Sequence, residues 1–421
     1  MPKYKKNKRR RRHTIFKFRR PDEYVEMTPS DSEDKASKVK KASFKIHNGK
    51  KQINKLKRLI FLGVFLAVAL VIILISLLSP TGIAEMYKNF SATFSLNSKL
   101  PIELYGTETY NVSVHNNYFC LLSDTDFSTI SNNGKVSFRD NHGFSSPIMC
   151  DSEARTLIFD QNGKGVRIYN AEGLLHSFDY TNSIYAADIA RNGYFAVAGK
   201  AENYTSMVTV YNKNGDMIYE WYCPEEIINS VAVAPDGKSV AVGTVSVSDG
   251  EFTGKIYVLK YNSADAVYKK EYDDKIIYAI NSVTRKNFAV VFENSCDIIS
   301  WKDYSAVTYN SEYDVNFVRA TAKRIAIASS RESNDGNYEF NVYNNSKKLV
   351  FSFKFDGHIN DFQIRKNNIY ILSGNSVYLI NSDGEIAKTG TANFGTVKII
   401  PVSSSSCLAV GHNSVTKISL Q

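Results

Sequence analysis

The chain has 421 residues, five cysteines and a net charge of +10. The charge is unevenly divided, because residues 1–58 contain 21 Lys/Arg and 6 Asp/Glu, whereas the rest of the chain contains 31 and 36. The basic character therefore belongs to an N-terminal tail, and the remainder is long enough for a substantial hydrophobic core. An odd number of widely spaced cysteines argues against a complete disulfide framework and favours small buried thiols.

The basic tail, residues 1–58, has no sustained apolar periodicity, and we expect it to be disordered. Its densest run, Lys5 to Arg20, reads KKNKRRRRHTIFKFRR. Such a run suits either nucleic acid or anionic lipid head groups, because both present negative charge. The apolar segment that follows the tail favours lipid, so no nucleic-acid partner is expected. An acidic, hydroxyl-rich stretch at 28–35 is interpreted as a solvated spacer, with phosphorylation as the alternative.

Residues 59–79 form an uncharged apolar run, LIFLGVFLAVALVIILISLLS. As a helix, 21 residues span about 31 Å, the thickness of a bilayer's hydrocarbon core. The run is longer than the apolar part of a usual signal peptide, and no clear cleavage site follows it. We therefore predict an uncleaved transmembrane helix in a lipid bilayer. Lys55, Lys57 and Arg58 stand directly before it and predict a cytoplasmic N-terminus with basic side chains at the membrane interface.

A repeated pattern marks the extracytoplasmic domain, which is expected over 100–421 after a linker at 80–99. An apolar strand ends in Tyr-Asn or Ile-Asn and is followed by turn residues, at intervals of roughly 40 residues. Asn tolerates the left-handed backbone and hydrogen-bonds locally, so these asparagines are assigned to structural hairpin turns. They are Asn170, Asn212, Asn262, Asn344 and Asn381.

Each repeat is expected to contain four short strands. In the clearest repeat they lie at 230–234, 239–243, 255–261 and 267–272, with a Pro-Asp-Gly-Lys turn after the first. Four antiparallel strands in about 40 residues are typical of a β-propeller blade. The first strands are expected to begin near Tyr110, Pro147, Ile184, Ile228, Ile276, Val315, Ile359 and Thr396.

The last repeat contains only three predicted strands. We expect a segment near 100–105 to supply its missing outer strand, because this would close the ring and remove an exposed sheet edge. The predicted fold class is therefore all-β, with an eight-bladed propeller of four-stranded antiparallel blades and a seven-bladed propeller as the alternative.

Short motifs in the repeats resemble those of known propellers. The segment VAPDGKSVAVG at 233–243 resembles the hairpin of WD-type and quinoprotein-like repeats, and Gly357-His358 with Asp361 resembles the Gly-His element of WD repeats. The layout of basic tail, single apolar segment and Tyr/Asn-rich repeats resembles an uncharacterised family of Gram-positive, clostridial-type single-pass membrane proteins with a propeller-like ectodomain. That resemblance implies no transferable activity.

The sequence favours a non-enzymatic protein over an enzyme. The Trp-docking motif of quinone-dependent propellers is absent, with Trp221 and Trp301 as the only tryptophans. The histidines lack metal-ligand spacing, so no catalytic residue, cofactor or metal is predicted. We expect a binding or scaffold module for an unknown envelope protein or wall polymer. The alternatives are a hydrolase or lyase acting on envelope glycans at the propeller axis, and a sensor whose tail is modified at Thr28, Ser30 or Ser32.

Overall fold

The computed structural model describes residues 59–71, 100–103, 109–115, 118–131, 136–152, 154–282, 284–321, 323–330 and 336–421. These residues form one helix, at 59–71, and 32 strands. The chain divides into two compact units, Met1–Leu74 with the helix and Ile75–Gln421 with the strands.

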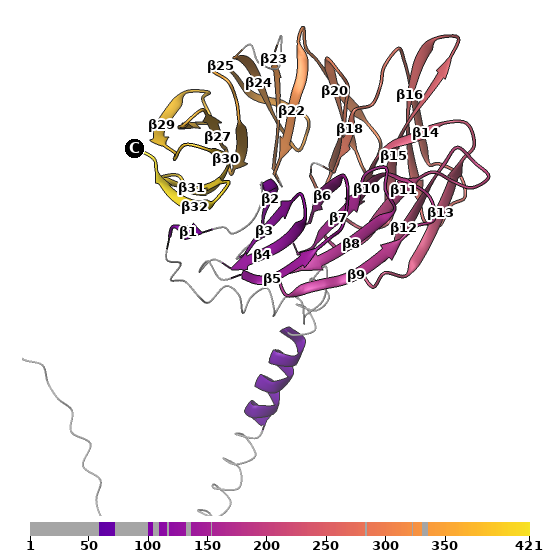
Figure 1. Cartoon of the computed structure of the whole chain (residues 1–421), viewed down its shortest axis with the longest axis horizontal. Coiled ribbons are helices and arrows are strands. Elements are labelled where there is room, and N and C mark those ends of the chain that lie inside the picture. The colour runs from indigo at the N-terminus through magenta and orange to yellow at the C-terminus, as the bar shows by residue number, and fades with distance from the viewer. Residues whose placement is uncertain are drawn as a thin grey trace, which may run out of the picture. The chain divides into compact units, whose positions relative to one another are not determined.

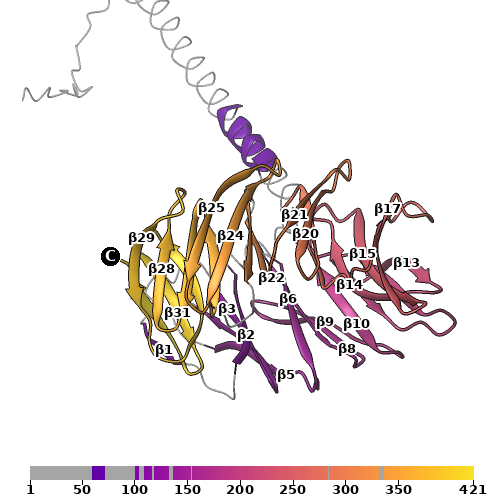
Figure 2. The same ribbon diagram turned by 90° about the horizontal axis from the view of Figure 1, so that it is seen from above.

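The strands form eight four-stranded antiparallel sheets within the described residues, and these sheets follow one another around a ring (Figures 1 and 2). This confirms the eight-bladed propeller over the seven-bladed alternative. Blades 1 to 4 comprise β2 (Thr109–His115), β3 (Tyr118–Ser123), β4 (Asp126–Ser131) and β5 (Val136–Asn141); β6 (Pro147–Asp151), β7 (Thr156–Asp160), β8 (Gly165–Asn170) and β9 (Gly173–Asp179); β10 (Ile184–Ile189), β11 (Phe195–Gly199), β12 (Ser206–Tyr211) and β13 (Met217–Cys223); and β14 (Ile227–Val233), β15 (Ser239–Ser248), β16 (Glu251–Lys260) and β17 (Tyr268–Asp273).

Blades 5 to 7 follow the same order, and each first strand begins within three residues of its predicted position. They comprise β18 (Ala279–Asn281), β19 (Asn287–Val291), β20 (Ser295–Ser300) and β21 (Ala306–Asn310); β22 (Asp314–Ala320), β23 (Arg324–Ser330), β24 (Asn337–Asn344) and β25 (Leu349–Asp356); and β26 (Asp361–Arg365), β27 (Asn368–Ser373), β28 (Ser376–Ile380) and β29 (Ile386–Thr391).

Blade 8 combines the two ends of the propeller. It consists of β30 (Thr396–Ser403), β31 (Ser406–Gly411), β32 (Ser414–Ser419) and, as the outer strand, β1 (Ile102–Glu103). In the antiparallel register Ile102 lies opposite Val415 and Glu103 lies opposite Ser414. The closing strand thus lies where the sequence places it. Because β1 covers the edge of β32, the outer edge of this sheet is paired.

The hydrophobic core lies between the faces of successive blades. One buried cluster joins Phe340 of β24 to Phe362 of β26, and another joins Val112 of β2 to Val415 of β32 across the ring closure. Second strands such as β11 are buried on both faces, so they read as continuous apolar runs. Fourth strands such as β13 have one solvent-facing side, so their burial alternates.

All five cysteines are free thiols. Cys120, Cys223, Cys296 and Cys407 are buried, and Cys150 is partly buried. This confirms the prediction of buried thiols in place of a disulfide framework.

The helix at 59–71 begins the apolar run that is predicted to span a membrane, and residues 72–79 of that run lie outside the described residues. Its large apolar side chains are exposed, with Phe61 at 75% and Phe65 at 63%. In the part of the chain that the structure describes, no helix combines the length and the apolar character needed to cross a membrane.

Candidate functional site

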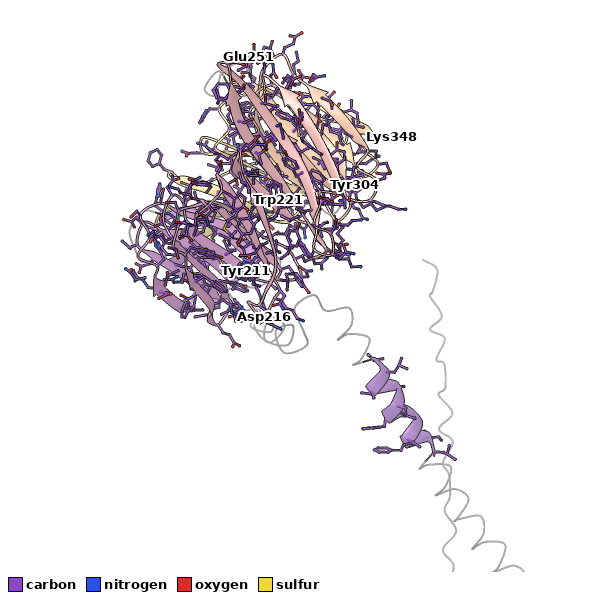
Figure 3. All side chains as sticks on the ribbon, turned by 90° about the vertical axis from the view of Figure 1, so that its right-hand side faces the viewer. Tyr211, Asp216, Trp221, Glu251, Tyr304 and Lys348 are labelled. Carbon is purple, nitrogen blue, oxygen red and sulfur yellow. The ribbon has the colours of Figure 1, made fainter. Side chains whose placement is uncertain are left out.

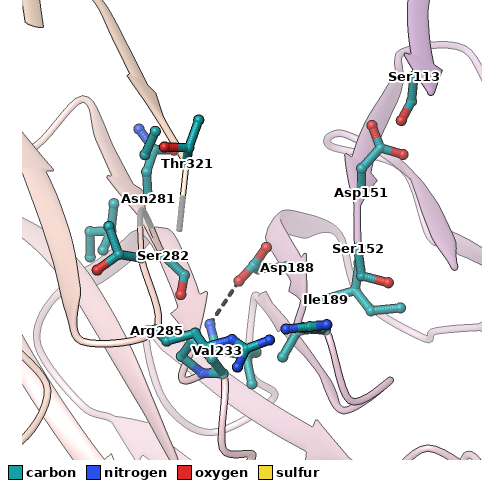
Figure 4. A pocket seen from close by; sticks show the side chains of 16 residues that line it. Ser113, Asp151, Ser152, Asp188, Ile189, Val233, Asn281, Ser282, Arg285 and Thr321 are labelled. Carbon is teal, nitrogen blue, oxygen red and sulfur yellow. Dashed lines mark hydrogen bonds between the residues drawn. The ribbon is translucent and has the colours of Figure 1, made fainter. Parts of the chain in front are cut away.

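A pocket of about 550 Å³ opens at the centre of the ring (Figure 4). Sites for small ligands commonly have volumes of roughly 300–1,000 Å³. The walls of this axial pocket come from the first strands of blades 1 to 6 and from the turns after them, and they are largely polar. The lining residues are Ser113, Asp151, Ser152, Asp188, Ile189, Ala190, Arg191, Val233, Pro235, Ile280, Asn281, Ser282, Thr284, Arg285, Ala320 and Thr321.

Asp188 of β10 is a half-buried carboxylate in the wall of the axial pocket. Its Oδ2 accepts a hydrogen bond from the N–H of Val233 on β14, with an N···O distance of 2.7 Å (Figure 4). Burial raises the pKa of Asp188 to about 6, and hydrogen bonds from the N–H groups of Val233 and Ile189 oppose the rise. Asp188 therefore joins two blades through backbone contacts, and its role in the wall is structural.

Side-chain contacts of this kind recur around the axis. Each first strand is the inner edge of its sheet, so some of its backbone groups need partners outside the sheet. Among the described residues, four more side chains of first strands bond to a backbone group of the first strand in the next blade. Cys150 Sγ donates to Ala187 O (3.2 Å), and Lys398 Nζ donates to Val112 O. Ser230 Oγ accepts from Ile280 N–H (2.7 Å), and Asp361 Oδ2 accepts from Ile399 N–H (3.0 Å).

The Asp188→Asn variant tests this structural role. The pKa of Asp188 is higher in the folded protein than in the unfolded chain, so ionisation of Asp188 favours the unfolded chain. The contribution of Asp188 to stability therefore falls as pH rises from about 4 through about 6. Asn cannot ionise, but its side-chain oxygen still accepts from Val233. The free energy of unfolding of the variant minus that of the wild type should therefore increase by about 1–3 kcal/mol from pH 4 to pH 8, as measured by chemical denaturation. An equal stability difference at both pH values would contradict this role.

A second polar cluster lies beside the axial pocket, where blades 1 and 2 meet. The Nε2 atom of buried His115 lies 3.0 Å from Thr156 Oγ1 and 3.5 Å from Asp151 Oδ1. Burial lowers the pKa of His115, but hydrogen bonding to Asp151 and Cys120 outweighs it and raises the pKa to about 10. Burial also raises the pKa of the Cys120 thiol. A buried neutral thiol is a poor nucleophile, so this cluster serves packing between blades better than catalysis.

A patch of exposed apolar side chains lies at the other end of the strands. Strand β14 begins at Ile227 in this patch and ends at Val233 in the axial pocket, so the two features occupy opposite ends of that strand. The patch, here called the aromatic patch, consists of Tyr204, Tyr222, Ile227, Val247, Phe252 and Tyr278, with exposed fractions between 43% and 61%.

Ring contacts and strand register define two groups within the aromatic patch. The rings of Tyr204 and Tyr222 lie 5.0 Å apart. In the strand register Val247 lies opposite Phe252, and Ile227 lies opposite Val245 on the same face as Val247. Strands β15 and β16 extend beyond β14 and β17, so Val247 and Phe252 stand near the tip of a projecting hairpin, with Glu251 at its outer end (Figure 3).

A slot of about 420 Å³ adjoins Tyr278, between the first strands β18 and β22. Its sides include Ala279, Val315 and Phe317. Glu293 and Asp314 also line it, and both are exposed. This slot has a lining of mixed polar and apolar groups, and it lies beside Tyr278 of the aromatic patch.

The predicted turn asparagines lie at the end of a third strand or in the turn that leads to the fourth. Asn170 Oδ1 accepts from the N–H groups of Glu172 (2.9 Å) and Gly173 (3.1 Å). Asn212, Asn344 and Asn381 each accept from the N–H groups two and four residues later, and Asn262 lies in the turn between β16 and β17. The side chains of Asn170, Asn212, Asn344 and Asn381 thus organise their turns, and none of the five asparagines lines the axial pocket or the slot. The predicted interfacial residues Lys55, Lys57 and Arg58 lie outside the described residues.

Sequence reasoning missed the aromatic patch and the slot. The strands predicted at 239–243 and 255–261 are observed as Ser239–Ser248 and Glu251–Lys260. The alternation of Val245, Val247 and Phe252 around Asp249-Gly250 was the available signal for this longer hairpin.

Comparison with known proteins places the propeller in a family. A sequence model described as a family of unknown function (DUF5711) matches residues 90–420. The chain belongs to the DUF5711 family. This confirms the predicted membership of an uncharacterised family, and the match covers all eight blades. A search of curated proteins finds no match for this DUF5711 sequence. Among solved structures, the crystal structure of BamB from Moraxella catarrhalis is similar, with 12% identity and a TM-score of 0.49 over 76% of this chain and 100% of that chain.

Proposed function

We propose that this protein is a single-pass membrane protein whose extracytoplasmic propeller binds a protein of the cell envelope without catalysing a reaction. The aromatic patch carries this proposal. Exposed aromatic and aliphatic side chains that gather on one end of a molecule are characteristic of protein interaction sites, and here they lie on strands and connections at one end of a closed ring.

The membrane anchor is proposed from the helix and its flanks. The exposed apolar side chains of residues 59–71 would be unfavourable in water and favourable in lipid. The 21 basic residues of the tail favour a cytoplasmic N-terminus and contact with anionic lipid head groups. The propeller then lies on the opposite side of the membrane.

An enzyme acting on envelope glycans is the alternative. Asp151 and Asp188 are carboxylates in the axial pocket, as such a site would require. However, Asp188 accepts from the Val233 N–H and Asp151 accepts from the Thr156 hydroxyl. Both carboxylates are therefore engaged with protein groups, which favours the binding module.

A pull-down from cross-linked envelopes tests the proposed function. The bait is the full-length protein in a neutral detergent, as wild type or as the double variant Val247→Ser/Phe252→Ser. Both side chains are exposed, so the substitutions should change stability by less than about 0.5 kcal/mol. We expect one protein partner to be retained by the wild type and reduced at least tenfold with the variant.

The matched control is Ile386→Ser, which replaces a 56% exposed side chain on the outer strand of blade 7. It should retain the partner at the wild-type level. Absence of any retained protein, together with turnover of envelope glycans by the same sample, would overturn the proposal in favour of the enzyme.

A further inference from the structure

The surroundings of the aromatic patch are acidic. Glu225, Asp249, Glu251, Asp273 and Asp274 are all exposed on the hairpin and on the segments beside it. The backbone N–H of Asp274 donates to Phe252 O at 2.9 Å, and Thr253 pairs with Asp273 in the strand register, so these acids adjoin the patch directly.

Nearby lysines offset part of this charge. Lys255 Nζ lies 2.7 Å from Glu226 Oε1 and so pairs with another acid, whereas Lys275 Nζ lies 3.1 Å from the neutral Ser295 Oγ and keeps its positive charge beside Asp273 and Asp274. Lys200, in the loop before Tyr204, is an exposed cation near the patch. Carboxylates therefore outnumber cations around the exposed apolar side chains, and this region should attract positively charged groups.

The slot beside Tyr278 continues this pattern. Six consecutive residues of β22, from Asp314 to Arg319, line it. Because β22 is the edge strand of its sheet, its backbone forms part of the slot wall. At one position this edge is already bonded, since Val315 N–H donates to Glu293 O at 2.6 Å. The slot is thus a recess of mixed lining beside a strand edge, and its charged lining residues are the acids Glu293 and Asp314 and the base Arg319.

These features together describe a receptor for an extended chain. Recognition of an extended segment at a strand edge uses pockets for side chains to obtain specificity. Here the recess offers the apolar side chains of Ala279, Val315 and Phe317. Its two acids outnumber its one base, Arg319, so the charge around it is net negative. Charge complementarity therefore selects a positively charged segment that carries an apolar or aromatic side chain, and it disfavours an anionic wall polymer.

We infer that the slot and the aromatic patch bind an extended basic segment of a partner protein, with an apolar side chain in the slot and Lys or Arg side chains beside Glu293 and Asp314. This inference rests on the proposed function, and it adds the chemical class of the partner.

Peptide binding to the full-length protein tests the inference. The probe is a fluorescent ten-residue peptide with four lysines around one central phenylalanine, and binding is measured by fluorescence anisotropy in a neutral detergent. Two comparison peptides carry glutamate in place of lysine, or glycine in place of phenylalanine. We expect the basic peptide to bind, its glycine form to bind at least fivefold more weakly, and the acidic peptide not to bind.

Charge reversal locates the interaction. The variant Glu293→Lys/Asp314→Lys should weaken binding of the basic peptide at least tenfold. The control is Asp383→Lys, which reverses an exposed acid in the turn between β28 and β29, and it should have less than a twofold effect. An unchanged melting temperature for all variants verifies their folding. Equal binding of the acidic and basic peptides, or an equal effect of both charge reversals, would overturn the inference.

The same variants separate this inference from the proposed function. If the envelope partner is lost with Val247→Ser/Phe252→Ser but bound equally or better by Glu293→Lys/Asp314→Lys, the binding module stands and the basic partner is wrong. If no envelope protein is retained by the wild type, the proposed function itself fails.

Discussion

Replacing Asp297 with alanine is expected to lower the free energy of unfolding by about 1.5–3 kcal/mol. Asp297 of β20 is 1% exposed and accepts hydrogen bonds from Lys270 Nζ (2.7 Å), Tyr272 OH (2.8 Å) and Thr308 Oγ1 (2.6 Å). Lys270 and Tyr272 belong to β17, so this carboxylate joins blade 4 to blade 5. Its removal leaves the buried hydroxyl of Tyr272 without an acceptor, whereas the more exposed Lys270 and Thr308 can turn to water.

The effect of Asp297 should depend on pH. Burial by itself raises the pKa of Asp297, but hydrogen bonds from Lys270, Thr308 and Tyr272 outweigh burial and hold the pKa below its usual value. A lowered pKa in the folded state adds stability above the unfolded pKa of about 4, and that stability is lost as pH falls through the folded value. Chemical denaturation of the Asp297→Ala variant should therefore show its largest deficit at pH 7 and a smaller one near pH 3. A deficit independent of pH, or one below about 1 kcal/mol, would contradict this role.

The Phe340→Ala variant should lose about 3–5 kcal/mol of stability. Phe340 of β24 is fully buried, and its ring centroid lies 4.6 Å from that of Phe353 and 5.3 Å from that of Phe362 on the next blade. Truncation removes these contacts and leaves a cavity between blades 6 and 7.

Phe394 provides the matched control for Phe340. It has the same side chain but is 94% exposed, so Phe394→Ala should change stability by less than about 0.5 kcal/mol. Comparable losses for the two variants in thermal unfolding would show that the interblade core is not where this structure places it.

Local sequence signals were sufficient for the blades because each blade is built from local antiparallel pairs. The turn at Asn212 and the Pro-Asp-Gly-Lys turn at 235–238 both join strands that pair with each other. Closure by β1 could be predicted for a different reason, since a repeat with three strands leaves an edge that requires a partner.

Contacts between blades could not be predicted in the same way. Asp188 and Val233 are 45 residues apart, and no pattern near either one indicates that a carboxylate meets this N–H. The aromatic patch escaped prediction because apolar residues in a strand usually point to a core. Val247 and Phe252 are exposed only because their hairpin extends beyond the neighbouring strands, and such an extension depends on the register of the whole sheet.

Site-specific photo-cross-linking in intact cells tests the central claim most directly. A photoreactive benzophenone side chain is placed at position 278, beside the slot, or at position 394, on an exposed connection between blades 7 and 8. We predict one protein adduct from position 278, none from position 394, and cross-linked peptides that contain an apolar residue flanked by Lys or Arg. Adducts from position 394 alone, or an acidic cross-linked segment at position 278, would contradict the claim that this acidic, aromatic surface binds a basic partner.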